Sequence, residues 1–339
     1  MVDPMDTVTP APTTAIPRPA PTADERLSEL LDAELAYDPV ARGGFINHTA
    51  MALAAAWRLG ATTEELDALY HDDVTSDFLI GRREPSGLMA VRRDVESVGV
   101  EAAVRRAAPA LVSSPGSQFF HAVIRLEYGL DVAHTAQVAN ALHNWAHHGE
   151  PMADLPTPRG DRAFVDVARD LVASPDTGGV RLGRLGDTVS RDMGSTSWFA
   201  DALAEADLDA PGLLDEVASV ALAAHVAGAN IGSLHLVTGT RATRVVAPLL
   251  AAPLARELTA RIAQAVAAGL WAAKGSLPEE AELDDLRSQP MPAWDDIARA
   301  AIDTGDHHVI KLTYTSLRET QVTDDPLYRW VAAREAGLV

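Results

Sequence analysis

Apolar residues recur every three to four positions along most of this chain and seldom alternate one-for-one with polar residues. That period places them on one face of a helix, so the pattern predicts a mostly α-helical fold. Aromatic residues make up only 5% of the sequence, while Ala, Leu and Val dominate, which favours helices over sheets. With 339 residues, 47% of them hydrophobic, the chain can bury a substantial core. We therefore expect a single all-α, multi-helix domain over residues 24–339.

The first 23 residues are rich in Pro, Ala and Thr, and they contain neither an apolar segment nor a basic start. We interpret residues 1–23 as a disordered tail, distinct from a signal peptide or a membrane anchor. Asp24 can cap the first helix, and Thr62 with Glu65 fits a capping box for the helix that follows Gly60. The helix-turn-helix pattern of residues 47–71 leaves an α-solenoid arrangement open.

Further helices are expected at 88–108, 116–129, 131–148, 160–173, 212–227, 232–250 and 254–274. The longest glycine-rich interruption, "ASPDTGGVRLGRLGD" at 173–187, is expected to form an active-site loop or a lid. Its glycine spacing matches neither a dinucleotide-binding fingerprint nor a P-loop.

The formal charge of −20 would repel nucleic acid phosphates and anionic membrane surfaces, so neither is an expected partner. The chain has no cysteine, which excludes disulfides, thiolate catalysis and cysteine-type zinc sites. A reducing compartment is compatible with this composition, and we expect a cytoplasmic protein.

The most obvious metal motif is the pair His143 and His147 in "NALHNWAHHGE", because an i, i+4 spacing puts two imidazoles on one helical face. The predicted buried stripe of that helix consists of Val138, Ala141, Leu142 and Trp145. Both histidines point well away from this stripe, so we interpret them as part of a polar helix end.

Four other histidines lie in separate apolar helical stretches: His48, His121, His235 and His308. Each alone is more often a hydrogen-bonded core residue than a metal ligand, but their joint occurrence favours one shared site. His48 projects over small alanine side chains, and His235 is followed by Thr238 and Gly239, which leave room on its face.

The other two histidines of this set share their helical faces with polar groups. Arg125 and Tyr128 lie on the side of His121, which is unusual for an inward-facing stretch. On the face of His308 lie Lys311, Thr315 and Glu319.

Lysine is rare in this chain, which contains 26 arginines and only two lysines, Lys274 and Lys311. A divalent ion bound by four neutral imidazoles lacks an anionic ligand. Burial and a nearby ion would lower the pKa of Lys311, and a neutral amine can react with carbon dioxide to form a carbamate, which arginine cannot do. The alternative is a lysine that extends to the surface or pairs with Glu319.

Four segments together resemble the questin oxidase-like family of aromatic polyketide metabolism: "NHTAMALAAAWRLGATTEELDALY", "FFHAVIRLEYGLD", "LHLVTGTRATR" and "HVIKLTYTSLRE". They spread over residues 44–320. The resemblance implies an oxygenase of secondary metabolism that opens anthraquinone rings by a Baeyer–Villiger-type oxidation. It also implies a mononuclear non-haem iron(II) held by His48, His121, His235, His308 and a carboxylated Lys311. His307 departs from the pattern, since an acidic residue is common there.

On this basis we expect a non-haem iron oxygenase that uses dioxygen to cleave a planar phenolic or quinone substrate. Arg125 and Tyr128 would orient or polarise substrate oxygens, with Lys311 as the anionic ligand. Thr315 and Glu319 would fix the carbamate or a ligand imidazole. Relatives are associated with NADPH as reductant, but no nucleotide-binding motif is present here. The alternatives are a metal-dependent hydrolase with a carbamylated lysine and a helical binding protein without catalysis.

Overall fold

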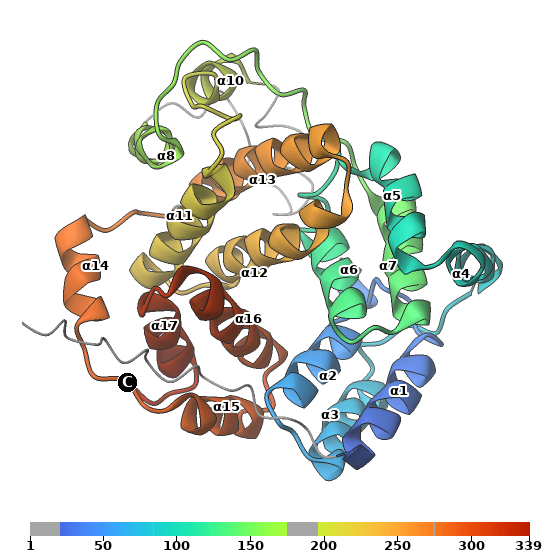
Figure 1. The fold of residues 1–339 in the computed structure, drawn as a ribbon. Helices are drawn as coiled ribbons and strands as arrows, with labels where there is room; N and C mark the ends of the chain where they lie inside the picture. The colour runs from blue at the N-terminus through green and yellow to red at the C-terminus, as the bar shows by residue number, and fades with distance from the viewer. Residues whose placement is uncertain (1–20, 84, 175–195, 274) are drawn as a thin grey trace, which may run out of the picture.

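A computed structural model describes residues 21–83, 85–174, 196–273 and 275–339 of the chain (Figure 1). Helices form nearly all of the regular structure in these residues. The only β-type pairings in the described residues are three isolated bridges: Tyr37 with Gly81, Val40 with Ile46, and Arg162 with Ala206. The predicted all-α class is confirmed.

The helices of the N-terminal half are α1 (Pro21–Glu34), α2 (Thr49–Arg58), α3 (Thr63–Thr75), α4 (Pro85–Val98), α5 (Val100–Leu111), α6 (His121–Asp131), α7 (Thr135–His148) and α8 (Phe164–Ala173). Those of the C-terminal half are α10 (Ser197–Leu203), α11 (Leu213–Ala227), α12 (Ile231–Val246), α13 (Ala252–Ala272), α14 (Glu280–Arg287), α15 (Trp294–Asp303), α16 (His307–Thr323) and α17 (Leu327–Glu335). Two short 3-10 helices, η1 (Arg42–Gly44) and η3 (Ala247–Leu249), complete the set.

Four helices from distant parts of the sequence form a closed ring of contacts at the centre of the fold. α2 packs against α6, α6 against α12, α12 against α16, and α16 returns to α2. Figure 1 shows these four toward the middle of the view, with the other helices around them. Most of the buried apolar side chains of the described residues form one continuous cluster, so the ring is held within a single core.

Helix boundaries differ from the sequence prediction where glycine or proline chemistry was decisive. α1 begins at Pro21, so Asp24 lies inside its first turn and does not cap it. The predicted helix over 88–108 is two helices, because Gly99 adopts a positive φ of 86° between them. The Thr62–Glu65 capping box is present as predicted.

The expected N-terminal tail and the expected loop or lid lie almost entirely outside the described residues. Residues 1–20 of the expected tail lie outside the described residues. The same holds for 175–187 of the expected loop or lid and for Lys274. No helix in the described ranges is long and apolar enough to cross a membrane.

Candidate metal centre

Three of the four predicted ligands converge at the centre of the helix ring. His48 Nε2 lies 2.6 Å from His121 Nε2, and His121 Nε2 lies 3.1 Å from His235 Nε2. One nitrogen of each ring lies within 4.8 Å of the others, which makes the three a group that could hold a metal ion. Two imidazole nitrogens bound to one ion at about 2.1 Å stand about 3.0–3.4 Å apart. The separation of His121 and His235 already falls in that range.

Backbone carbonyls fix which nitrogen of two rings is free to bind a metal. Nδ1 of His121 lies 2.6 Å from the carbonyl oxygen of Gln118, and Nδ1 of His235 lies 2.6 Å from that of Ile231. A carbonyl can only accept, so each Nδ1 must carry the proton and donate it. In the neutral rings both Nε2 atoms therefore present lone pairs, and these face each other. A bound cation would remove that repulsion, and an imidazole anchored by its second nitrogen is typical of metal ligands.

His308 supplies a fourth ring at the edge of this group. Its ring centroid lies 4.6 Å from that of His48 and 5.6 Å from that of His235. His308 Nδ1 faces the carboxylate of Asp306 at 3.6 Å, and its Nε2 is a buried nitrogen without a hydrogen-bond partner among the described residues. An unpartnered buried acceptor next to three converging imidazoles fits a fourth ligand.

Three of the four histidines lie at the start of their helices, and the fourth lies one turn further along its helix. His48 is the N-cap residue of α2, and His121 is the first residue of α6. His235 and His308 are the fifth residue of α12 and the second of α16. Since the imidazoles meet, the N-termini of α2, α6 and α16 converge on the centre, and each carries a partial positive charge. These charges favour an anion beside any bound cation.

Burial keeps these imidazoles neutral. It lowers the pKa of His48, His121 and His235 well below the ordinary value of 6.5, and the neighbouring cationic groups lower it further. Neutral imidazole is the form that binds Fe(II), Zn(II) and similar ions. The donor set therefore fits a divalent metal ion.

Lys311 lies one helical turn after His308, and its side chain is only 1% exposed. Burial, followed by the charge of Arg125, lowers the pKa of its amine from 10.5 to about 7. No carboxylate of the described residues forms an ion pair with it, so neither form of the alternative, a surface position or a pairing with Glu319, occurs. A buried amine of this kind is a candidate nucleophile toward carbon dioxide.

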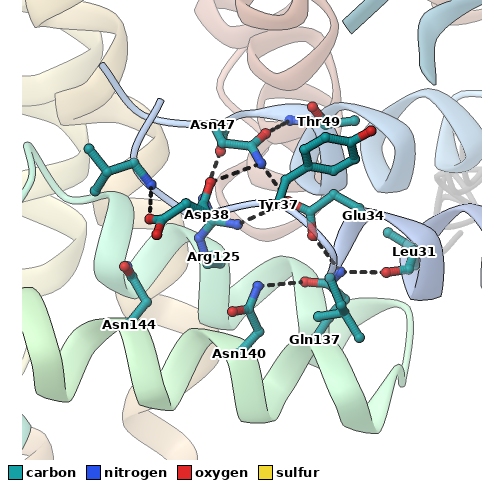
Figure 2. Close-up of polar contacts among 12 residues, drawn as sticks. Leu31, Glu34, Tyr37, Asp38, Asn47, Thr49, Arg125, Gln137, Asn140 and Asn144 are labelled. Carbon is teal, nitrogen blue, oxygen red and sulfur yellow. Dashed lines mark hydrogen bonds and ion pairs between the residues drawn. The ribbon is translucent and has the colours of Figure 1, made fainter. Parts of the chain in front are cut away.

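Arg125 belongs to a buried polar network between α1, α6, α7 and the segment before α2 (Figure 2). Its Nη2 donates to the carbonyl oxygen of Asn47 at 2.6 Å. Glu34 accepts from the Asn47 amide at 2.7 Å and from Gln137 at 2.9 Å. Because Asn47 immediately precedes His48, the network fixes the backbone that carries this ligand.

Within the described residues, the cavity that Arg125 and Tyr128 line is too small for an aromatic substrate. Both are 2% exposed, and they line a cavity of about 10 Å³, which holds about one water molecule. The Tyr128 hydroxyl donates to the carbonyl oxygen of Lys311 at 3.4 Å. These positions differ from the expected contact with a substrate, and they assign both side chains to the support of the centre.

Glu319 and Thr315 on α16, which we predicted to support the ligands, have different surroundings in the structure. Glu319 is 1% exposed, and its carboxylate pairs with Arg241 at 3.3 Å and with Arg244 at 3.2 Å. These arginines consume its acceptor capacity, so the expected contact with a carbamate or a ligand imidazole is replaced by an ion-pair cluster. Thr315 is 1% exposed on the same helix, one turn after Lys311.

Two carboxylates beside the centre were not predicted. Asp306 caps α16 by accepting from the backbone of His308 and Val309, and it also faces the His308 ring. His307 pairs with Asp73 at 3.4 Å, and Asp73 accepts from Thr49 at 2.5 Å. An aspartate directly before a helical stretch is an N-cap signal, so Asp306 could have been found from the sequence. Asp73 could not, because it comes from a different helix.

A strained turn before α6 was also missed. Gln118, Phe119 and Phe120 have φ values of 51°, 54° and 68°, all in the left-handed region. Such a conformation costs roughly 1–3 kcal/mol for each non-glycine residue and seldom occurs in succession. The predicted helix over 116–129 therefore begins only at His121.

The pair His143 and His147 lies in the last two turns of α7. Their rings stack with centroids 5.2 Å apart, but in the described part of the chain they belong to no group of three ligands. His147 is exposed and His143 half-buried.

Comparison with protein-family models and with curated proteins identified no relative of this chain. No protein-family model matches the chain, and no curated protein matches it at the similarity that would indicate a relative. The functional argument therefore depends on the residues of the centre.

Proposed function

We propose that this protein is a cytoplasmic, mononuclear non-haem iron oxygenase that acts on a planar phenolic or quinone substrate. The observation that carries the proposal is the convergence of His48, His121 and His235, whose Nε2 atoms meet in the core with His308 and Lys311 beside them. The resemblance to questin oxidase-like proteins supports the same ligand set and a ring-cleaving oxidation.

The chain would hold the ion through the four imidazoles, with the carbamate of a carboxylated Lys311 as the anionic ligand. A bound iron(II) ion would supply the one-electron chemistry that allows dioxygen to react with a closed-shell organic molecule. Burial keeps the imidazoles of His48, His121 and His235 neutral, and the same burial would exclude bulk water from a bound ion.

The electrostatics of the centre favour an electron-rich, acidic substrate. Three helix N-termini and the buried guanidinium of Arg125 would stabilise negative charge at the site. A phenol approaching the centre would lose its proton more readily there than in water, and a phenolate is richer in electrons at the ring carbons. The substrate would reach the ion from the side of His48 and His308, because His121 and His235 are enclosed.

A reductant such as NADPH is compatible with this proposal as a diffusing co-substrate, since the sequence has no dinucleotide-binding motif. A hydrolase would use the same ligands to activate water, commonly with two ions about 3.5–4 Å apart. The described residues contain one ligand group of three histidines, which favours a single ion.

The test is metal analysis and oxygen consumption of protein purified without dioxygen. We expect about one iron per chain, and oxygen uptake with hydroxyanthraquinones that is absent without substrate. His235→Ala should lose both properties, and His143→Ala should retain them. Two metal ions per chain, or hydrolysis of esters without oxygen uptake, would favour the hydrolase. A protein that retains no metal would favour a binding protein without catalysis.

A further inference from the structure

We propose that the left-handed turn Gln118–Phe120, seated against Gly239, sets the position and the tautomer of His121 relative to His235. Gln118 and Phe120 are thereby positioning residues for the centre. Gly239 has no side chain, which leaves the space that the Phe120 ring occupies. The inference rests on the proposed metal centre for its consequence, but the geometry of the turn stands without a metal.

The carbonyl of Gln118 is the link between the turn and the ligand. It lies 2.6 Å from Nδ1 of His121 and accepts its proton, so Nε2 is left with its lone pair toward His235. A right-handed helical start would direct this carbonyl along the helix axis toward the backbone N–H groups of the next turn. With the left-handed φ values of Gln118, Phe119 and Phe120, the carbonyl instead meets His121 itself: it accepts from the Nδ1–H of the side chain at 2.6 Å and from the backbone N–H of the same residue at 3.3 Å.

Each side chain of the turn is held by a neighbouring helix. The Gln118 side chain accepts from the amide of Asn144 on α7 at 2.9 Å. The Phe119 ring meets the edge of His235 with centroids 5.3 Å apart. The Phe120 ring is 1% exposed and lies over Gly239 on α12. Strained backbone persists only where its surroundings fix it, and these three contacts do so.

The contact between Phe120 and Gly239 leaves no room for a side chain at position 239, which lies one turn after His235. A Cβ atom there would stand 2.6 Å from Cγ, 2.7 Å from Cδ1 and 2.8 Å from Cβ of Phe120. These atoms lie close to the backbone of the turn, so they can yield only if the turn moves. An added methyl group would thus push the turn away from α12, and the Gln118 carbonyl would move with it.

Gly269 on α13 provides a matched control. It is also a buried helical glycine that faces α12, and a Cβ atom there would stand 2.7 Å from Cδ2 of Leu236. That atom is the far end of a flexible side chain, which can rotate without moving the backbone. Both Gly→Ala changes raise helix propensity by the same amount, so they differ in the neighbour that must yield.

The experiment compares wild type, Gly239→Ala and Gly269→Ala in two measurements. Long-range ¹H–¹⁵N spectra of histidine-labelled, metal-free protein report the tautomer of His121, and Co(II) titration reports metal affinity. In wild type and Gly269→Ala we expect the Nδ1–H tautomer and similar affinities. In Gly239→Ala we expect a mixed or reversed tautomer and at least about tenfold weaker Co(II) binding, as for loss of other outer partners of metal ligands.

A further variant keeps the proposal testable if Gly239→Ala fails to fold. Phe120→Leu retains apolar volume but not the ring over Gly239, so it should shift both readouts in the direction expected for Gly239→Ala.

Unchanged tautomer and affinity in Gly239→Ala, or in Phe120→Leu where the first variant does not fold, would overturn the proposal. If wild type binds no Co(II), the metal centre fails, and the tautomer comparison still decides the role of the turn.

Discussion

His48 and His121 stack with their rings 10° from parallel, and their Nε2 atoms are 2.6 Å apart. His121 donates its Nδ1–H to the carbonyl oxygen of Gln118, so Nε2 of the neutral ring can only accept a hydrogen bond. The proton between the two rings is therefore carried by Nε2 of His48. A metal ion must displace that proton and separate the two nitrogens by several tenths of an ångström to reach about 3.0 Å. We therefore expect metal binding to replace the hydrogen bond between the two rings.

The first prediction distinguishes the buried group from the surface pair. His121→Ala and His235→Ala should each weaken Co(II) or Fe(II) binding by at least about a hundredfold, because each removes a direct ligand from a site of few donors. The double variant His143→Ala, His147→Ala should bind one ion with nearly wild-type affinity. Calorimetric titration measures both. Loss of binding in the double variant, with retention in His121→Ala, would show that the surface pair is the metal site.

The second prediction concerns the pH dependence of stability in metal-free protein. His121 and His235 stay neutral in the fold because burial lowers their pKa, whereas in the unfolded chain they take up protons near pH 6.5. The unfolded state then binds more protons, so stability falls as the pH drops below about 6.5, by up to about 1.4 kcal/mol per pH unit for each histidine. Above that pH the two contribute no slope.

Urea unfolding between pH 7.5 and 5.5 measures this slope. His121→Gln should reduce this slope by the amount that corresponds to about one bound proton. The expectation holds whatever the variant does to the stability at neutral pH. A slope that is the same in wild type and variant would mean that His121 is protonated in the folded protein.

The third prediction concerns Glu319, which the sequence placed beside the ligands and the structure pairs with Arg241 and Arg244. Glu319→Ala leaves two largely buried guanidinium groups without this partner, so it should destabilise the fold by about 3–5 kcal/mol. Metal affinity of the folded fraction should remain near that of wild type. A strong loss of affinity without loss of stability would return Glu319 to the centre.

The sequence predicted which histidines form the centre better than it predicted how the surrounding helices are arranged. The helical period is a local signal, and it was sufficient to select His48, His121 and His235, which the structure brings together. The rarity of lysine motivates Lys311 as a ligand, and that role stays a prediction. The convergence of α2, α6, α12 and α16 depends on which helices become neighbours, and helical periodicity does not contain that information.

The misplaced residues have the same cause. Projection onto one helix showed that Arg125 faces inward, but not that Asn47 from another segment would accept its hydrogen bond. It also assumed a regular helix through Phe120, where tertiary contacts hold a left-handed turn. Glu319 shares a helical face with Lys311, yet the arginines of α12 decide its partners.

The last prediction concerns Lys311, whose buried amine has a pKa lowered to about 7. Above that pH the amine is neutral and can attack carbon dioxide, forming an N–C bond and losing one proton to give the carbamate anion. Lys311→Arg installs a permanent cation beside the ion and cannot form the anion, so we expect at least about tenfold weaker metal binding and loss of oxygen uptake. Lys311→Ala removes the anion but leaves space, so formate or acetate should partly restore metal binding.

Carboxylation itself adds a carbon that can be traced. Protein loaded with metal in ¹³C-bicarbonate at pH 8 should show a carbamate carbon resonance that is absent from Lys311→Ala, and the signal should decline as the pH falls through 7, because protonated amine does not react. A diamagnetic ion such as Zn(II) keeps this resonance observable. Wild-type metal affinity in Lys311→Arg, or an identical spectrum in wild type and Lys311→Ala, would contradict the carbamate. An unmodified amine facing the ion would leave the four imidazoles as ligands and make Lys311 a proton donor at the centre.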